Sequence, residues 1–163
     1  MDAYTCIRTK RDTRSYQDRP IPEESLRRIL QAGRMAGSAK NLQPCRFVIL
    51  QEVSKKKELA GCGQFAQHIV SAPIVVAIVL PEGGREFDAG RCAQNMMLAA
   101  WAEGVTSCPV TMHDGACALR VLGIPQGHRV SIVLAFAYPP PSGPESRGMP
   151  RIPLDELVHQ GGW

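Results

Sequence analysis

The sequence predicts a three-layer α/β or α+β domain, in which helices cover both faces of a sheet. Strand-like and helix-like runs alternate along the 163 residues, an order typical of such layers. Residues 73–80, PIVVAIVL, are apolar at every position, so this strand must be covered on both faces. Residues 88–104, DAGRCAQNMMLAAWAEG, form a helix with few polar positions, which predicts a buried helix that packs partly against another subunit.

Two helices are expected before the first strand. The first covers residues 3–11 and is capped by Asp2, whose carboxylate can accept from the first backbone N–H groups. The second opens at Pro20 and Pro22 and is stopped by Gly37, since proline suits a first helical turn and glycine a helix end. Its core positions repeat at helical spacing: Leu26, Ile29 and Leu30.

The middle of the chain continues the alternation. Residues 46–50, RFVIL, read as a strand, and Ser54 then caps a short helix over 54–60. A further short helix is expected over 64–70, before the apolar strand. Residues 81–87 form a turn, after which Asp88 caps the buried helix, as a carboxylate favours this position.

The last third adds two more extended segments. Residues 105–112 read as a strand or extended loop, and Asp114 caps a helix that ends at Gly123. Residues 128–139, HRVSIVLAFAYP, are a strand that the following prolines cut off. Residues 153–163 close the chain as a short amphipathic helix or arm.

Composition narrows the class of protein. The length suits one domain over 1–163, with 139–163 as a Pro-rich C-terminal arm, and 44% apolar with 21% charged residues is a globular composition. A net charge of +4 with 6% aromatic residues is no signature of a nucleic-acid partner. The longest apolar run is too short to span a bilayer, and no apolar signal segment opens the chain. We therefore expect a cytoplasmic protein that binds neither nucleic acid nor membrane.

The six cysteines stand at positions 6, 45, 62, 92, 108 and 117, with no C-x-x-C pair. Cys108, His113 and Cys117 lack a fourth ligand at a usual spacing, so no metal site is expected. A disulfide framework is not expected either, and most cysteines should be small buried apolar residues. Fingerprints for a P-loop, a dinucleotide fold, a serine hydrolase or a zinc protease are all missing from the sequence.

One basic cluster lies near the N-terminus. Lys10, Arg11 and Arg14 stand at i, i+1 and i+4, so Lys10 and Arg14 can converge on one anion if this segment is helical. A cluster this local suits a small anionic group such as a phosphate. A solvated helix face is an equally good interpretation of the same three residues.

Five segments taken together resemble the nitroreductase family, the FMN-dependent flavoenzymes. The family's N-terminal basic motif is matched by KRDTRSY at 10–16, and its small-Ser-Ala-x-Asn-x-Gln-Pro turn by GSAKNLQP at 37–44. The other matches are the helix at 88–104 leading to TSCPVTMHD, the segment LGIPQGHRVSIVLAFAYP at 122–139, and RIPL at 151–154. They follow in order over nearly the whole chain.

The resemblance implies a nitroreductase-like α+β sandwich, with a mainly antiparallel central sheet between helices. It implies a homodimer with FMN at the subunit interface. The implied activity passes electrons from NADH or NADPH to a small acceptor such as a nitroaromatic or a quinone. Because the flavin carries the chemistry, no catalytic side chain is expected.

The resemblance also assigns cofactor-binding residues. Lys10, Arg11, Arg14 and Arg151 would hold the FMN phosphate, and Asp12, which stands where the family motif has Ser, would orient the arginines. The flavin ring would be held by two loops: Gly37, Ser38, Asn41 and Gln43 in one, and Pro109, Val110, Thr111 and Met112 in the other. A backbone N–H of the second loop would face the hydride-carrying nitrogen.

Three alternatives remain open from the sequence. The same fold could carry another flavin chemistry, such as flavin fragmentation or dehalogenation. The protein could also bind flavin without turnover. Finally, it could be a thiol-based redox protein that uses Cys45 or Cys108.

Overall fold

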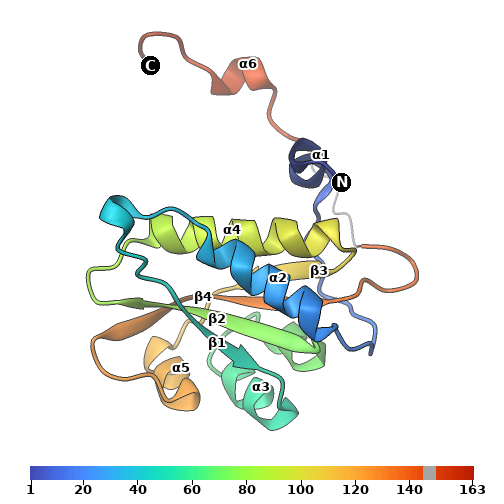
Figure 1. Ribbon diagram of the computed structural model, residues 1–163, viewed down its shortest axis with the longest axis vertical. Coiled ribbons are helices and arrows are strands. Elements are labelled where there is room, and N and C mark those ends of the chain that lie inside the picture. The colour runs from blue at the N-terminus through green and yellow to red at the C-terminus, as the bar shows by residue number, and fades with distance from the viewer. Residues whose placement is uncertain (145–149) are drawn as a thin grey trace.

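A four-stranded antiparallel sheet forms the centre of the described structure (Figure 1). The computed structural model describes residues 1–144 and 150–163. The strands are β1 (Arg46–Leu50), β2 (Ile74–Pro81), β3 (Thr106–Val110) and β4 (His128–Ala137), in the order β1-β2-β4-β3. Every neighbouring pair is antiparallel, which confirms the predicted antiparallel sheet.

Helices cover both faces of this sheet, as the apolar strand required. Helices α2 (Glu23–Arg34) and α4 (Glu86–Ala102) lie on one face, and α3 (Val53–Ala60) and α5 (Gly115–Leu122) lie on the other (Figure 1). Alternate residues of β2 point to opposite faces, so Val76 and Ile78 enter the α2–α4 core while Val75 and Ala77 enter the second core. The three-layer α+β prediction is confirmed.

The close packing of α2 on α4 depends on one glycine. A Cβ atom at Gly33 would lie 2.3 Å from Met96 Cε and 2.9 Å from Met96 Cγ. Met96 is fully buried in α4, so a larger residue would displace it. Asn95 Nδ2 also donates to the carbonyl oxygen of Ala32 at 3.2 Å. These contacts hold α2 against the helix that borders the candidate site.

The two ends of the chain lie away from the sheet. Helix α1 (Ala3–Thr9) contacts α4, and the C-terminal segment with α6 (Leu154–Leu157) extends from the body beyond α1 (Figure 1). All residues from 150 to 163 are exposed. Of the predicted arm at 139–163, residues 145–149 lie outside the described residues. Within the part of the chain that the structure describes, no helix combines the length and apolar character needed to cross a membrane.

Several predicted helix ends are wrong by a few residues. The first helix ends at Thr9, because the chain then becomes extended and Thr13 N donates to Ser107 O at 3.2 Å. The buried helix begins at Glu86, so Asp88 lies in its first turn and does not cap it. Residues 64–70 do not form an α-helix, and a 3-10 helix, η2, spans Gln67–Ser71. The prediction for α5 is confirmed by its cap, since the Asp114 carboxylate accepts from Cys117 N at 2.8 Å.

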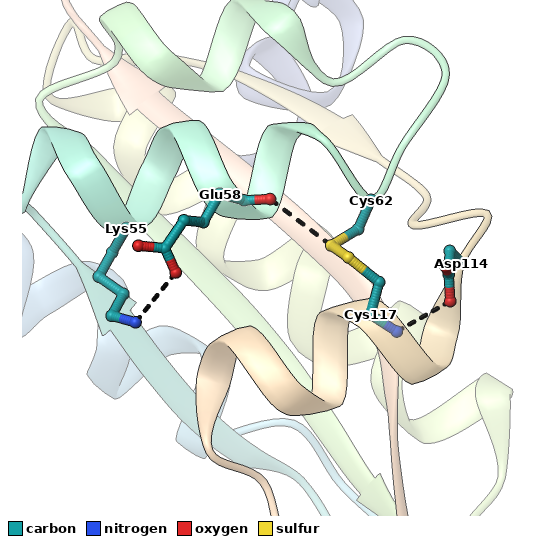
Figure 2. Close-up of a disulfide and its surroundings, with 5 residues drawn as sticks. All are labelled: Lys55, Glu58, Cys62, Asp114 and Cys117. Atoms are coloured by element: carbon teal, nitrogen blue, oxygen red, sulfur yellow. Dashed lines mark hydrogen bonds and ion pairs between the residues drawn. A yellow bond between two sulfur atoms is a disulfide. The ribbon is translucent and has the colours of Figure 1, made fainter.

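One pair of cysteines contradicts the expectation that no disulfide forms. Cys62 and Cys117 are joined by a disulfide across 55 residues of sequence. Figure 2 shows that this bond connects the chain just after α3 to the first turn of α5. The pair could not be recognised from sequence, because partners so far apart have no spacing signature.

Candidate cofactor site

A basic cavity of about 510 Å³ lies between α1, α4 and β3. It gathers all four cations that the sequence assigned to a phosphate: Lys10, Arg11, Arg14 and Arg151. Asp12 and Pro109 also line the cavity, together with Ile7, Gln94 and Met97, which sequence reasoning did not select. One carboxylate against four cations leaves the cavity strongly positive, which favours an anionic ligand.

Residues 10–14 are extended, so the helical argument for Lys10 and Arg14 is wrong. Asp12 forms a parallel bridge with Ser107, at the outer side of β3. Alternate residues of an extended segment share a side, so Lys10, Asp12 and Arg14 can face the cavity while Thr13 is fully buried on the opposite side. The sheet edge therefore fixes the direction of the basic side chains.

The charges in this cavity are partly paired. Lys10 Nζ forms an ion pair with Asp12 and lies 3.5 Å from Met97 Sδ, so its ammonium is held against α4. Arg11 Nη1 donates to the carbonyl oxygens of Arg8 at 3.1 Å and Lys10 at 2.8 Å. Asp12 was expected to orient the arginines, but its described ion pair is with Lys10. Arg14 is exposed, which leaves its guanidinium accessible to a ligand.

A second hollow adjoins the basic cavity and shares Arg14 and Pro109 with it. Its other lining residues come from the loop before η2, from η2 itself, and from the end of β3 and the loop that follows it: Phe65, His68, Val110, Thr111 and His113. Met112, predicted to bind the cofactor, turns its side chain into the core and is 8% exposed. Only the backbone of Met112 is therefore suited to a ligand on this side.

Two histidines in the hollow have defined hydrogen bonds. Gln64 N donates to His113 Nδ1 at 3.2 Å, which assigns the proton of a neutral imidazole to Nε2. His68 Nδ1 lies 3.0 Å from the Phe65 carbonyl oxygen, where an N–H can donate. Burial, and to a lesser degree the charge of Arg14, lowers the pKa of His68. The lowered pKa favours the neutral form of His68, beside the permanent cation of Arg14.

The loop after α2 is held in an uncommon backbone conformation. Lys40, Asn41 and Gln43 have φ angles of 51°, 54° and 49°, in the left-handed region that non-glycine residues rarely adopt. Ser38 Oγ accepts from Gln43 N at 2.8 Å, and Arg46 Nη1 donates to Gln43 O at 2.8 Å. Backbone strain of this kind is concentrated at functional sites, and here it leaves the side chains of Asn41 and Gln43 exposed.

This loop does not meet the basic cavity within one chain. Gly37, Ser38 and Gln43 line a separate cavity of about 210 Å³ with Asp88 and Cys92 of α4, whereas Gln94 and Met97 face the basic cavity. At about 100° per residue, these two pairs lie on roughly opposite sides of α4. In Figure 1 the loop, coloured cyan, lies near the opposite end of α4 from α1.

The cysteines in and near these cavities are poorly suited to thiolate chemistry. Cys45 and Cys92 line the cavity behind the loop. Burial raises the pKa of Cys45 to about 12 and also raises the pKa of Cys92. Cys108 is fully buried in β3. Since the thiolate is the reactive form, the interpretation as a thiol-based redox protein loses support.

Sequence reasoning missed the residues that complete the walls. Gln94 and Met97 are three residues apart on a helix that was interpreted as packing alone, although i and i+3 positions share a face. Phe65, His68 and His113 are distant in sequence and meet only because the η2 loop lies against the end of β3. No motif in the sequence indicates that meeting.

The fold is an α+β sandwich with an antiparallel sheet, a cationic cavity beside β3 and a strained polar loop on the other side of α4. The chain belongs to the nitroreductase family, whose model matches residues 7–78 and 81–138. The matched region includes the basic segment, the strained loop and the β3 loop.

Relatives of known sequence and structure cover almost the whole chain. A protein of Thermus thermophilus named NADH dehydrogenase is 27% identical over 97% of this chain and 95% of its own length. A protein of Desulfovibrio desulfuricans solved in complex with FMN is 27% identical, covers 100% of this chain and 99% of its own, and has a TM-score of 0.86. The NADPH:FMN oxidoreductase of Vibrio harveyi, solved with NAD+, shares the fold with a TM-score of 0.89 at 23% identity, over 98% of this chain and 77% of its own.

Proposed function

We propose that the protein is an FMN-dependent oxidoreductase that passes electrons from NADH or NADPH to a small acceptor such as a nitroaromatic or a quinone. The observation that carries the proposal is the convergence of Lys10, Arg11, Arg14 and Arg151 on one cavity that continues into an aromatic hollow. The names of the Thermus and Vibrio relatives and the FMN of the Desulfovibrio structure support it.

The residues of the two connected spaces fit the two ends of FMN. A phosphate carries about −1.5 to −2 charges near neutral pH, which suits the cations of the larger cavity, and Arg14 can pair with it bidentately. The flat ring suits the hollow between Phe65 and the loop Pro109–Val110–Thr111–Met112. Bound there, FMN would supply two-electron chemistry, accepting a hydride and returning electrons to the acceptor.

The protein would contribute binding, orientation and electrostatics. Phe65 and His113 meet edge to face with ring centroids 5.9 Å apart, and together offer an apolar wall with an Nε2–H donor for a polar ring substituent. A neutral His68 avoids a second positive charge beside Arg14. Thr111 is exposed where the loop after β3 borders the hollow, and its backbone would provide an N–H at the ring.

A homodimer would complete the site. The loop with Gly37, Ser38, Asn41 and Gln43 cannot reach the basic cavity of its own chain, because α4 separates them. In a twofold dimer the same surface patch occurs on both subunits, so this loop can complete the partner's cavity. Large apolar side chains are exposed on α1, α4 and the arm and would be covered there: Tyr4, Ile7, Phe87, Ile152, Leu154 and Leu157.

Two other activities of the same fold are distinguished by experiment, not by the fold itself. Flavin fragmentation or dehalogenation would use the same cavity, and a flavin-binding protein without turnover would also retain it.

We place the protein in the cytoplasm, where reduced nicotinamides are available to it, as part of this proposal.

The absorption spectrum of the purified protein tests the proposal. Flavin absorbance that bleaches on anaerobic addition of NADH or NADPH, and returns with a quinone or nitroaromatic, is the expected result. Mass spectrometry of the released cofactor should give FMN and not FAD, since no dinucleotide fingerprint is available for an adenylate half. If flavin is bound but neither NADH nor NADPH bleaches it, the oxidoreductase proposal is wrong. If the protein has no affinity for flavin, the assignment of FMN as its cofactor is wrong as well.

A further inference from the structure

The Cys62–Cys117 disulfide stands directly behind the wall of the aromatic hollow. Cys62 is three residues before Phe65, and Cys117 is four residues after His113. Phe65 and His113 are the two residues whose rings meet at this wall. The disulfide therefore joins the two chain segments that must stay together for the hollow to exist.

The same two segments share few other direct links. Asp114 N donates to Cys62 O at 2.9 Å, and Gln64 N donates to His113 Nδ1 at 3.2 Å. Gly63 lets the segments approach closely, because a Cβ there would lie 3.2 Å from Thr111 O and 3.3 Å from Met112 Cε. Beyond these contacts, the loop before η2 is largely exposed at Gly61, Gln64 and Phe65. A covalent bond is thus the strongest connection across this wall.

We propose that Cys62 and Cys117 form a redox-responsive clasp, which a dithiol reductant opens and which thereby controls how tightly the hollow holds its ligand. When the bond is closed, the chain after α3 is held against the first turn of α5, in the arrangement that brings Phe65 onto His113. When it is open, the two segments are held by hydrogen bonds, a ring contact and close packing around Gly63 but by no covalent link, so the wall of the hollow is less firmly fixed.

Access to the two sulfurs sets the direction of exchange. Cys62 is 2% exposed, whereas Cys117 is half-buried, so the thiolate of the reductant reaches Cys117 Sγ. A bond forms between the reductant sulfur and Cys117 Sγ as the Cys62–Cys117 bond breaks. Cys62 leaves as a thiolate, which takes up a proton. The second thiol of the reductant then displaces Cys117. Overall, the dithiol is oxidised and two electrons and two protons pass to the cysteines.

The reduced state has a place for its new proton. Cys62 Sγ lies 3.6 Å from the carbonyl oxygen of Glu58 (Figure 2). A disulfide sulfur has no proton to donate, but the reduced Cys62 thiol can donate to this carbonyl. Opening the clasp therefore does not leave a buried polar group without an acceptor, which favours a reversible change over a loss of the fold.

This inference rests on the proposed FMN site, and the affinity for FMN is its readout. We expect the FMN dissociation constant to rise about fivefold or more when the bond is reduced, a size common for coupling between sites. The experiment titrates FMN against the full-length apoprotein by fluorescence quenching, with and without excess dithiothreitol under air. Alkylation and mass spectrometry count the thiols in each sample.

Two variants make the result specific. The Cys62→Ser/Cys117→Ser variant should bind FMN as weakly as the reduced wild type and should not respond to dithiothreitol, with circular dichroism confirming that it is folded. Cys6→Ser removes a buried thiol outside the clasp and should keep the full response. If the double variant does not fold, the FMN affinities of wild type and Cys6→Ser, each with and without dithiothreitol, still test the clasp. Both proteins should lose FMN affinity on reduction.

The possible failures are distinguishable. Equal FMN affinity in oxidised and reduced wild type overturns the clasp and leaves the FMN proposal standing. Six alkylated cysteines in the unreduced, denatured protein show that the bond does not form, and also overturn it. Absence of any FMN binding removes the proposed function, and the clasp with it.

Discussion

Separation of the two halves of the site by α4 predicts complementation between two defective subunits. One chain carries Arg11→Ala and Arg14→Ala and so loses two of the four cations of the basic cavity. The other carries Asn41→Gly and Gln43→Gly, which removes both amides while glycine retains the positive φ angles of 54° and 49°. Neither homodimer has an intact site. If each site combines the cavity of one subunit with the loop of its partner, the mixed dimer has one site with every group present.

The structure sets the expected magnitudes. Removing two exposed charge-assisted contacts costs about 4 kcal/mol, or roughly a thousandfold in affinity, and removing two neutral amides costs about 2 kcal/mol, or roughly thirtyfold. The mixed dimer has two sites, one with all four side chains and one with none. We therefore expect half of its sites to bind FMN with wild-type affinity.

The assay uses the mixed dimer purified through two different affinity tags after co-expression. An FMN titration should show two phases, with the tight phase at half a molecule per subunit. A matched control pairs the Arg11→Ala/Arg14→Ala chain with an Arg151→Ala chain; all three residues line one cavity, so no tight phase should appear. A mixed dimer with no tight phase would refute the two-subunit site, and so would a stable monomer that binds FMN.

Three further predictions concern single features of the chain. Arg14→Ala should weaken FMN about thirtyfold but leave riboflavin, which lacks the phosphate, nearly unchanged; equal weakening of both flavins in a fluorescence titration would contradict the phosphate assignment. Removing the Cys62–Cys117 bond, which closes a span of 55 residues, should lower the free energy of unfolding by about 4 kcal/mol, measured by urea denaturation under non-reducing conditions; a loss below about 1 kcal/mol would contradict the loop-entropy argument. Gly33→Ala should destabilise the protein by about 1–3 kcal/mol in the same assay, despite its better helix propensity, because its Cβ would meet Met96 Cγ at 2.9 Å; in a Met96→Ala background the same Gly33→Ala change should cost less, because the side chain that it meets is gone.

Much of the fold could be predicted because local signals and burial agree. The alternation of elements, the apolar run in β2 and the capped helix α5 each depend on contacts within a few residues or on a single periodicity. The wrong helix ends have a common cause. The end of α1 at Thr9 and the start of α4 at Glu86 are set by what the chain meets next, such as Ser107 beside Thr13, and propensity contains no information about those partners.

The candidate site also contains some residues that the sequence indicates and others that it does not. The basic residues could be selected from the sequence because the family resemblance names them and their charge suits an anion, and the structure brings them to one cavity without helical spacing. The disulfide and the Phe65–His113 wall could not be found, since each joins segments about 50 residues apart. A single sequence contains no information about which distant segments meet in the fold.

The strained loop connects these observations. Three non-glycine residues in the left-handed region cost of order 1 kcal/mol each or more, and the side chains of all three are exposed. Ser38 and Arg46 hold the conformation with hydrogen bonds at 2.8 Å, so it persists without a ligand. A conformation that is maintained at a cost and points its polar groups away from its own basic cavity is best explained if its ligand belongs to the cavity of a second subunit.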